Sequence, residues 1–200
     1  EKKYGRTLNE IKEKKIKIFK KIKILSNKND KKSLLKNSEK IISNFSNELN
    51  KLSPDLIILL GDRYEIFCIA YCAFILGIPI AHLYGGELTE NSLDDCLRHS
   101  ITKLSNFHFV STNDYKKRVL QLGENRKDVY HVGAFSLENI KKTDFLSKSS
   151  LQNKFKINLL SKMILCTLHP ETNNLIKSKK QIVSCLNSLE KIKNTTIIFT

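Results

Sequence analysis

The chain has 200 residues, of which 40% are hydrophobic, and carries a formal net charge of +15. This apolar content is enough for a globular core, but the longest apolar runs, residues 56–60 and 66–76, are too short to span a bilayer. The charge comes mainly from lysines spread along the whole chain, without interleaved aromatic residues or zinc-finger and RNA-binding signatures, which argues against a nucleic-acid-binding protein.

From residue 31 onward, helical patterns alternate with short apolar runs. After an irregular opening, residues 31–52 show apolar side chains at helical spacing, and the helix ends before Pro54. The continuous apolar run 56–60 predicts a strand buried on both faces of a parallel sheet. Further helices are predicted over 64–76, 91–104 and 112–122, and further strands over 78–83, 107–110 and 129–132. The alternation predicts βαβ units in an α/β fold with a Rossmann-like, doubly wound parallel sheet.

The composition changes at residues 141–158, where Ser, Lys and Asn replace the apolar rhythm. A second α/β pattern follows, with a strand at 163–168, a helix at 175–192 and a strand at 196–200. We therefore expect an N-terminal Rossmann-like domain over residues 1–145 and the start of a second Rossmann-like domain over 146–200. Because the chain lacks an initiator Met and its pattern stops inside a strand, we expect a piece truncated at both ends.

Cofactor and compartment signals are few. The five cysteines include no Cys-x-x-Cys pair, which indicates reduced structural thiols in a cytoplasmic protein and no metal site. The polar N-terminal segment does not resemble a signal peptide. Neither a GxGxxG loop nor a Walker A loop is present, so the chain lacks the dinucleotide fingerprint and the glycine-rich phosphate loop.

Three polar clusters follow predicted strands, at the edge where parallel sheets bind ligands. Asp62 and Arg63 follow the strand at 56–60, His82 and the loop 84–87 end the next strand, and His169 follows the strand at 163–168. Each cluster also has a plainer explanation, because an Asp at a strand end is often a turn residue and a strand histidine is often structural. Because three such clusters are expected at the same edge of the sheet, we favour a functional site there.

The second cluster continues into a helix that carries several charges. Gly85 and Gly86 allow a ligand to approach the backbone closely, and Glu87 follows them directly. On the predicted helix, Asp94 and Arg98 are four residues apart, and Asp95 and His99 repeat that spacing. An exposed helical ion pair would show the same spacing. Carboxylates beside basic groups suit acid–base chemistry on a phosphate-bearing substrate, so the residues alone predict an α/β enzyme with an acidic and basic cleft.

These motifs together resemble the hydrolysing branch of the UDP-N-acetylglucosamine 2-epimerase family, which acts in bacterial sialic and legionaminic acid synthesis. The matching motifs are Leu60-Gly61-Asp62-Arg63-Tyr64-Glu65, Ile78-Pro79-Ile80-Ala81-His82, Gly85-Gly86-Glu87, Thr89-Glu90, Asp94-Asp95 and Arg98-His99-Ser100-Ile101-Thr102-Lys103. Non-hydrolysing members typically have Gly-Asp-Thr and Glu-Ala-Gly where this chain has Gly61-Asp62-Arg63 and Tyr84-Gly85-Gly86.

The resemblance implies a glycosyltransferase-B-like fold of two domains with the active site between them, and a cofactor-free enzyme. The implied reaction removes the C2 proton of a nucleotide-linked N-acetylhexosamine, expels the nucleotide diphosphate and adds water to give a free ManNAc-type sugar. By resemblance, the catalytic residues are Asp62, Glu87, Asp94 and His169, with His169 near the leaving diphosphate. Likewise by resemblance, the substrate-binding residues are Arg63, His82, Gly86, Arg98 and His99.

Several alternatives stay open at this point. The fold also fits a non-hydrolysing epimerase or a glycosyltransferase, and a non-catalytic binding protein is a third reading. UDP-N-acetylglucosamine, UDP-diacetylbacillosamine and a GDP-linked sugar all remain possible substrates, and the acid is not distinguished from the base. We expect a homo-oligomer for the full-length form, no nucleic-acid or membrane partner, and little or no activity from these 200 residues alone.

Overall fold

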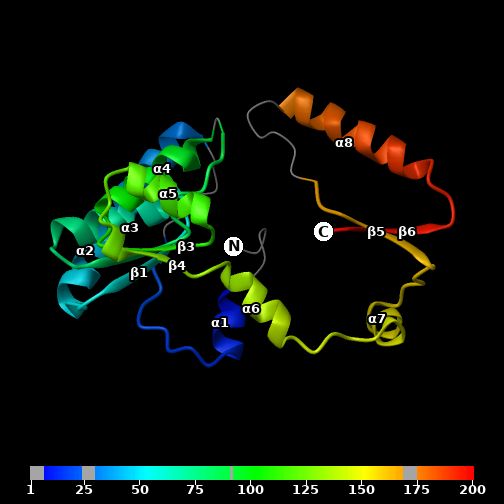
Figure 1. Ribbon diagram of the computed structural model, residues 1–200, viewed down its shortest axis with the longest axis horizontal. Helices are drawn as coiled ribbons and strands as arrows, with labels where there is room; N and C mark the ends of the chain where they lie inside the picture. Colours follow the sequence, from blue (N-terminus) through cyan, green and yellow to red (C-terminus); the bar gives the residue numbers. More distant parts are fainter. Residues whose placement is uncertain (1–6, 24–29, 91, 169–174) are drawn as a thin grey trace. The chain divides into compact units, whose positions relative to one another are not determined.

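The computed structural model describes residues 7–23, 30–90, 92–168 and 175–200 (Figure 1). The chain divides into two compact units, Glu1–Lys141 and Lys142–Thr200, each of which is described here by itself. Within the described residues, no helix is both long enough and apolar enough to cross a membrane.

The first unit alternates helices and strands as the sequence predicts. Its elements are α1 (Thr7–Glu13), α2 (Lys31–Leu52), β1 (Ile57–Leu60), α3 (Tyr64–Ile75), β2 (Ile80–Leu83), α4 (Leu93–Leu104), β3 (Phe107–Val110), α5 (Asn113–Gln121), the 3-10 turn η2 (Arg126–Asp128), β4 (Val129–His131) and α6 (Phe135–Lys142). Helices α2, α4 and α5 begin at side-chain caps, which are Asp30, Ser92 and Thr112. Helices α1 and α6 were not predicted, because at seven and eight residues they are too short to show a clear helical periodicity.

The four strands form one parallel sheet in the order β1-β2-β3-β4. Helix α3 packs against β1 and β2, α4 packs against β2, and α5 packs against β3 and β4. Right-handed crossovers between strands in sequential order place these helices on the same face of the sheet. The parallel α/β prediction is therefore confirmed. All four strands end at the same edge, which also receives the loops after β1, β2 and β3.

The core lies on this helix-covered face, where α2 also packs against α3. Its buried members come from the strands and from three helices: Leu49, Leu59, Ala70, Cys72, Ala73, Ile80 and Ile101. A smaller cluster of Val110, Val119 and Val129 joins α5 to β3 and β4. Removing these side chains from water gives the sheet edge a rigid base.

Strand β1 differs from the prediction that both of its faces are buried. Leu59 is 5% exposed, whereas Ile58 and Leu60 on the opposite face are 64% and 55% exposed. The prediction was wrong for the described part of the chain because the helices connecting β1 to β4 cover one face, and no described element covers Ile58 and Leu60. A continuous apolar run indicates a strand but does not reveal which elements pack on it.

The second unit contains α7 (Lys148–Phe155), β5 (Lys162–Cys166), α8 (Leu175–Glu190) and β6 (Thr195–Phe199). Strands β5 and β6 pair in parallel, with Lys162 opposite Thr195 and Cys166 opposite Phe199. Helix α7 occupies the Ser-rich, Lys-rich and Asn-rich stretch for which no element was predicted, and Ser147 caps it by accepting the backbone N–H of Ser150. The predicted strand–helix–strand order of this unit is confirmed.

Candidate functional site

A pocket of about 410 Å³ opens at the carboxyl ends of the strands in the first unit. It is lined by Leu60, Gly61, Asp62, Tyr84, Glu87, Arg98, Ser111, Ala134 and Ser136. These residues come from the last residue of β1, from the segments that follow β1, β2, β3 and β4, and from helices α4 and α6. The first two predicted polar clusters therefore meet at one edge of the sheet, and Asp62, Glu87 and Arg98 share one pocket.

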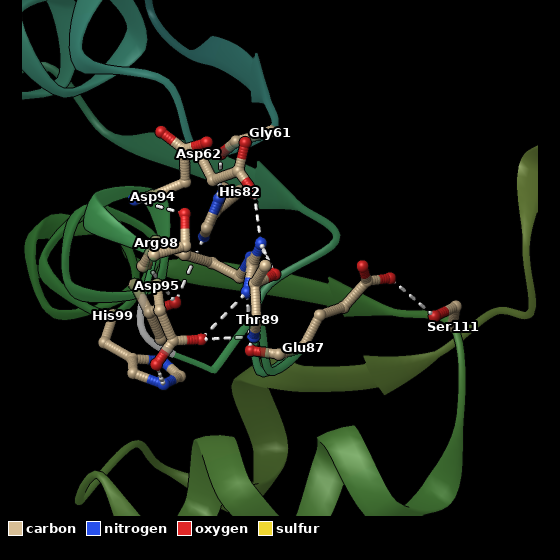
Figure 2. A network of polar contacts seen from close by, with 12 residues as sticks. Gly61, Asp62, His82, Glu87, Thr89, Asp94, Asp95, Arg98, His99 and Ser111 are labelled. Atoms are coloured by element: carbon tan, nitrogen blue, oxygen red, sulfur yellow. Dashed lines mark hydrogen bonds and ion pairs between the residues drawn. The ribbon is translucent and has the colours of Figure 1, made fainter. Parts of the chain in front are cut away.

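Arg98 is the centre of the polar network in this pocket (Figure 2). The residue is only 4% exposed, and its Nη2 donates to a carboxylate oxygen of Asp62 and to Thr89 Oγ1 at 3.0 Å. Its Nη1 donates to the carbonyl oxygen of Glu87 at 2.8 Å and to Asp95 Oδ1 at 3.2 Å. One buried guanidinium thus joins the turn after β1, the loop after β2 and helix α4.

Helix α4 places Arg98 in this position through its amphipathic pattern. The Ser92 side chain accepts the Asp94 backbone N–H at the start of the helix, and Asp94 and Asp95 lie in the first turn, where carboxylates are favourable. Arg98 shares the buried face with Ile101 and Thr102, three and four residues further on. The packing of this face turns the guanidinium toward the sheet edge.

Glu87 is half-buried, and different residues bind its backbone and its side chain. Arg98 binds its carbonyl oxygen, and the guanidinium of Arg118 on α5 donates to the carbonyl oxygen of Gly86 just before it. The carboxylate extends away from Arg98, and its Oε1 accepts the Ser111 hydroxyl at 3.2 Å (Figure 2). Glu87 therefore presents a carboxylate to the pocket on a fixed backbone, apart from the ion pair of Asp62.

Gly86 lies where a side chain does not fit. Its φ is +81°, and a Cβ there would lie 2.5 Å from the Tyr115 carbonyl oxygen and 2.9 Å from Val119 Cγ2. Gly61 has a similar φ of +92°, but a Cβ would meet nothing within 4 Å. Gly86 therefore requires both the positive φ and the missing side chain, whereas Gly61 requires only the positive φ.

Substitution of Gly86 by Ala is expected to cost more stability than the same change at Gly61. The left-handed backbone alone costs about 1–2 kcal/mol in either variant, and the clash with α5 adds about 1–3 kcal/mol for Gly86→Ala. Denaturant unfolding of both variants measures the difference. Equal losses in the two variants would contradict the close approach of the Gly86 loop to α5.

The other residues of α4 predicted for the site lie outside this pocket. Asp94 is half-buried, and the ion pairs of Arg98 are with Asp62 and Asp95 instead of with Asp94, four residues before it. His99 lies 3.7 Å from Asp95 through Nε2 and lines a separate hollow with Phe67 and Tyr71. The spacing therefore predicted the Asp95–His99 contact but not the partner of Arg98.

Arg63 and His169 complete the predicted set. The Arg63 side chain is 68% exposed and forms a bidentate pair with Glu65, through Nη2–Oε1 at 2.8 Å and Nε–Oε2 at 3.1 Å. The hydrogen bond to Glu65 is the main cause that raises the Arg63 pKa above its ordinary value, and the charge of Asp94 adds to it. His169 lies outside the described residues.

His82 does not line the pocket, although it was predicted to bind substrate. It is fully buried beneath the site on β2, and burial is the main cause that lowers its pKa from 6.5 to about 4. The nearby charge of Arg98 and the neighbouring His108 lower it further, while the hydrogen bond to the Gly61 carbonyl and the charge of Asp62 oppose the shift. His82 is therefore neutral at pH 7.

This neutral histidine is expected to make folding sensitive to acid. In the unfolded chain His82 takes up a proton near pH 6.5, but in the folded chain only near pH 4, so stability is lost as the pH falls between these values. The loss attributable to His82 is roughly 3 kcal/mol. Unfolding free energies of the wild type and His82→Gln, measured at pH 7 and pH 4.5, are expected to converge at the lower pH. A constant difference would show that His82 has no depressed pKa.

Six pocket residues were not among the site residues predicted from the sequence, although Tyr84 belongs to the predicted loop 84–87: Leu60, Gly61, Tyr84, Ser111, Ala134 and Ser136. Ser111 directly follows β3, so the rule that located Asp62 also applies to it. Tyr84 has a φ of +65°, its hydroxyl accepts the Phe135 backbone N–H at 2.9 Å, and its ring packs edge-on against that of Phe135. No local sequence signal indicates a positive φ at a tyrosine.

The other hollows and side-chain clusters of the described residues contain fewer groups that could catalyse a reaction. A larger hollow of about 790 Å³ lies along α8 and is lined by lysine, serine, asparagine and valine side chains without a carboxylate. Among the residues that the structure describes, no three His, Cys, Asp or Glu side chains are grouped as metal ligands. The pocket around Arg98 is therefore the candidate active site.

The chain is similar to curated proteins over nearly its whole length. The chain is 44% identical over 197 residues to a GDP/UDP-N,N'-diacetylbacillosamine 2-epimerase (hydrolyzing) from Campylobacter jejuni, a match that covers 98% of this chain and 51% of that protein. It is 31% identical over 185 residues to a UDP-N,N'-diacetylbacillosamine 2-epimerase (hydrolyzing) from Legionella pneumophila, covering 92% of this chain and 49% of that protein. The chain thus spans about half the length of these curated relatives.

Solved structures show the same fold. A crystal structure of UDP-GlcNAc 2-epimerase from Neisseria meningitidis bound to UDP-GlcNAc matches with a TM-score of 0.78 and 25% identity, over 94% of this chain and 53% of that one. The family model described as UDP-N-acetylglucosamine 2-epimerase matches residues 1–200. With its Rossmann-like fold and a cluster of carboxylates around Arg98, the chain belongs to the UDP-N-acetylglucosamine 2-epimerase family.

Proposed function

We propose that the complete protein is a hydrolysing 2-epimerase of a nucleotide-linked N-acetylhexosamine. One observation carries the proposal: Asp62 and Glu87 enter one pocket from two strand ends, and the buried guanidinium of Arg98 joins their two segments. The names of the relatives from Campylobacter jejuni and Legionella pneumophila support the hydrolysing reaction.

The reaction needs a base, an acid and stabilisation of a leaving group. Removal of the C2 proton and rupture of the bond between C1 and the diphosphate oxygen form a C1–C2 double bond, and the nucleotide diphosphate leaves with the bonding electrons. Water then adds its oxygen to C1, and a proton returns to C2 from the opposite face. The product is a free sugar with inverted C2. The proton transfers require carboxyl groups at hydrogen-bonding distance from the sugar.

Glu87 is the carboxylate best placed to exchange this proton. Its side chain reaches the pocket and contacts the neutral Ser111 hydroxyl, whereas Asp62 is engaged by the Arg98 guanidinium. We assign Glu87 to proton transfer and the Asp62–Arg98 pair to fixing the geometry of the site, with Asp62 also facing the sugar. Asp94 remains a further acid–base candidate beside the pocket, and its role rests on the family resemblance.

The remaining assignments concern the anionic half of the substrate. Arg63 is exposed, so its guanidinium is free to exchange Glu65 for a phosphate group. Gly86 brings the backbone close to the pocket. His99 lines a separate hollow, and its proposed substrate-binding role rests on the family resemblance. His169 is proposed to contact the leaving diphosphate, as the family resemblance implies.

The nucleotide sugar is proposed to be of the UDP-diacetylbacillosamine type, because the relatives from Campylobacter jejuni and Legionella pneumophila are both named for N,N'-diacetylbacillosamine. Such an enzyme would serve the synthesis of legionaminic or sialic acid. Five cysteines without a disulfide are consistent with the reducing cytoplasm, where we propose that the enzyme acts.

Incubation of the complete protein with UDP-diacetylbacillosamine, its GDP analogue and UDP-N-acetylglucosamine tests the proposal. We expect stoichiometric release of nucleoside diphosphate and of a free 2-epimerised sugar from at least one of them. Inversion at C2 with the nucleotide still attached would identify a non-hydrolysing epimerase instead. Release of nucleoside diphosphate that requires an added acceptor, with the sugar transferred to that acceptor, would identify a glycosyltransferase.

A further inference from the structure

His82 lies beneath the pocket and bonds to both elements that carry the Asp62–Arg98 pair. It belongs to the row Leu59, His82, His108 on the helix-covered face of the sheet, and it has no exposed surface. Its Nε2 lies 2.9 Å from the carbonyl oxygen of Gly61, and its Nδ1 lies 3.2 Å from Thr102 Oγ1. Figure 2 shows the ring between the Gly61 turn and helix α4.

The partners determine which ring nitrogen carries the proton. A carbonyl oxygen only accepts, so the bond to Gly61 requires a proton on Nε2. In the neutral ring, Nδ1 is then an acceptor, and the Thr102 hydroxyl donates to it. Thr102 Oγ1 also lies 3.0 Å from the carbonyl oxygen of Arg98, which accepts the hydrogen bond of the Thr102 hydroxyl if Nδ1 becomes protonated. Burial favours the neutral ring.

The ring also has little room to move. A Cβ at Gly85 would lie 3.0 Å from Thr102 Oγ1 and 3.2 Å from His82 Nδ1, so the Gly85 backbone closes the space beside the imidazole. Gly61 has a left-handed backbone, a Cβ there would meet nothing within 4 Å, and its N–H donates to the Leu83 carbonyl oxygen at 3.4 Å. The hydrogen bond from His82 holds the carbonyl oxygen of the same residue.

We propose that His82 is a positioning residue that holds the Gly61 carbonyl through Nε2–H and thereby sets Asp62 against Arg98, without contact to the substrate. Asp62 directly follows Gly61, and Arg98 lies one helical turn before Thr102, so the imidazole anchors the backbone on both sides of the ion pair. This role replaces the substrate-binding role predicted from the sequence. Its kinetic consequence rests on the proposed function, but its geometric consequence does not.

A pair of variants of the complete protein tests the proposal. In His82→Gln the amide keeps an N–H donor within reach of the Gly61 carbonyl, whereas His82→Leu fills the space without a donor. We expect kcat of the Leu variant to fall by about a hundredfold, the size of a loss from a slightly misplaced catalytic group. KM should stay within about threefold, because no substrate contact is removed. The Gln variant should recover most of the lost kcat.

Two measurements separate this proposal from a failure of the proposed reaction. In ¹⁵N-histidine NMR at pH 7, His82 should show a protonated Nε2 and an unprotonated Nδ1, whose signals do not shift when a nucleotide sugar is added. Crystal structures should show the Asp62–Arg98 contact retained in His82→Gln and broken in His82→Leu. Neither readout requires turnover, so both remain decisive if no nucleotide sugar is hydrolysed.

Other outcomes would overturn the proposal. A raised KM with unchanged kcat, or NMR signals that shift on ligand addition, would make His82 a substrate-binding residue. An intact Asp62–Arg98 pair in His82→Leu would show that the imidazole does not position it. Equal losses of kcat and of thermal stability in the Leu and Gln variants would assign His82 to the core alone.

Discussion

Replacement of Arg98 by Met is expected to destabilise the first unit by about 3–5 kcal/mol, the usual cost of removing one partner from a buried ion pair. The change leaves Asp62 and Asp95 without their guanidinium, with side chains only 27% and 22% exposed, and it removes the donor to the Glu87 carbonyl. Because the loops after β1 and β2 are then no longer joined, activity of the complete protein should fall by at least about a hundredfold. Denaturant unfolding and kcat measure the two effects.

Two control variants separate the loss of the Arg98 hydrogen-bond network from the loss of a positive charge. Arg98→Lys keeps the charge but has no planar fork to serve four acceptors, so it should recover only part of the loss. Lys117→Met removes a cation from an exposed pair with Asp114, whose side chains are 74% and 79% exposed, and should change stability by less than about 1 kcal/mol. An Arg98→Met variant as stable as Lys117→Met would refute the central role of Arg98.

Substitution of Glu87 by Gln is expected to lower kcat of the complete protein by about 10²–10⁴-fold, the contribution of a positioned general acid or base. The amide has nearly the same shape and its oxygen still accepts the Ser111 hydroxyl, so the fold and the pocket should persist. Binding of the nucleotide sugar, measured by calorimetry, should change far less than kcat.

Glu90→Gln is the matched control for this change. Glu90 lies three residues further along the same loop, is exposed and does not line the pocket, so the variant loses the same charge without losing the proposed proton carrier. Its kcat should equal that of the wild type. Equal effects at both positions would mean that the loop acts through its net charge, and an unchanged kcat in Glu87→Gln would remove Glu87 from the chemistry.

The α/β order was predictable because short strands rich in β-branched and aromatic residues alternate with helices of recognisable pattern. Helices α4 and α5 are amphipathic and capped by side chains, and α3 is a mostly apolar stretch followed by Gly77. The bounds of α2 and β3 were predicted to the residue. The helices α1, α6 and α7 were missed because they are only seven or eight residues long, which is too short for a helical periodicity to repeat clearly. The open face of β1 was missed because a run of apolar residues contains no information on what packs against it.

For the site, the strand-end rule located Asp62, Glu87 and the helix with Arg98, but not the partners within it. Helical spacing favours Asp94 for Arg98, whereas the observed partners are Asp95 and Asp62, and the second of these lies 36 residues away. His82 was predicted as a site residue because it lies near the end of a strand. The alternation of side chains along β2 instead points its imidazole into the core. Such long-range pairings follow from the register of the sheet, which a single sequence does not show.

Incorporation of deuterium tests the central claim most directly. The complete protein is incubated with its nucleotide sugar in D₂O, and the released free sugar is examined by NMR and mass spectrometry. We predict one deuterium at C2 of the free 2-epimerised sugar from the wild type, and no released sugar from Glu87→Gln over the same period. A free sugar that retains its original proton at C2 would contradict proton removal at this pocket and, with it, the proposed reaction.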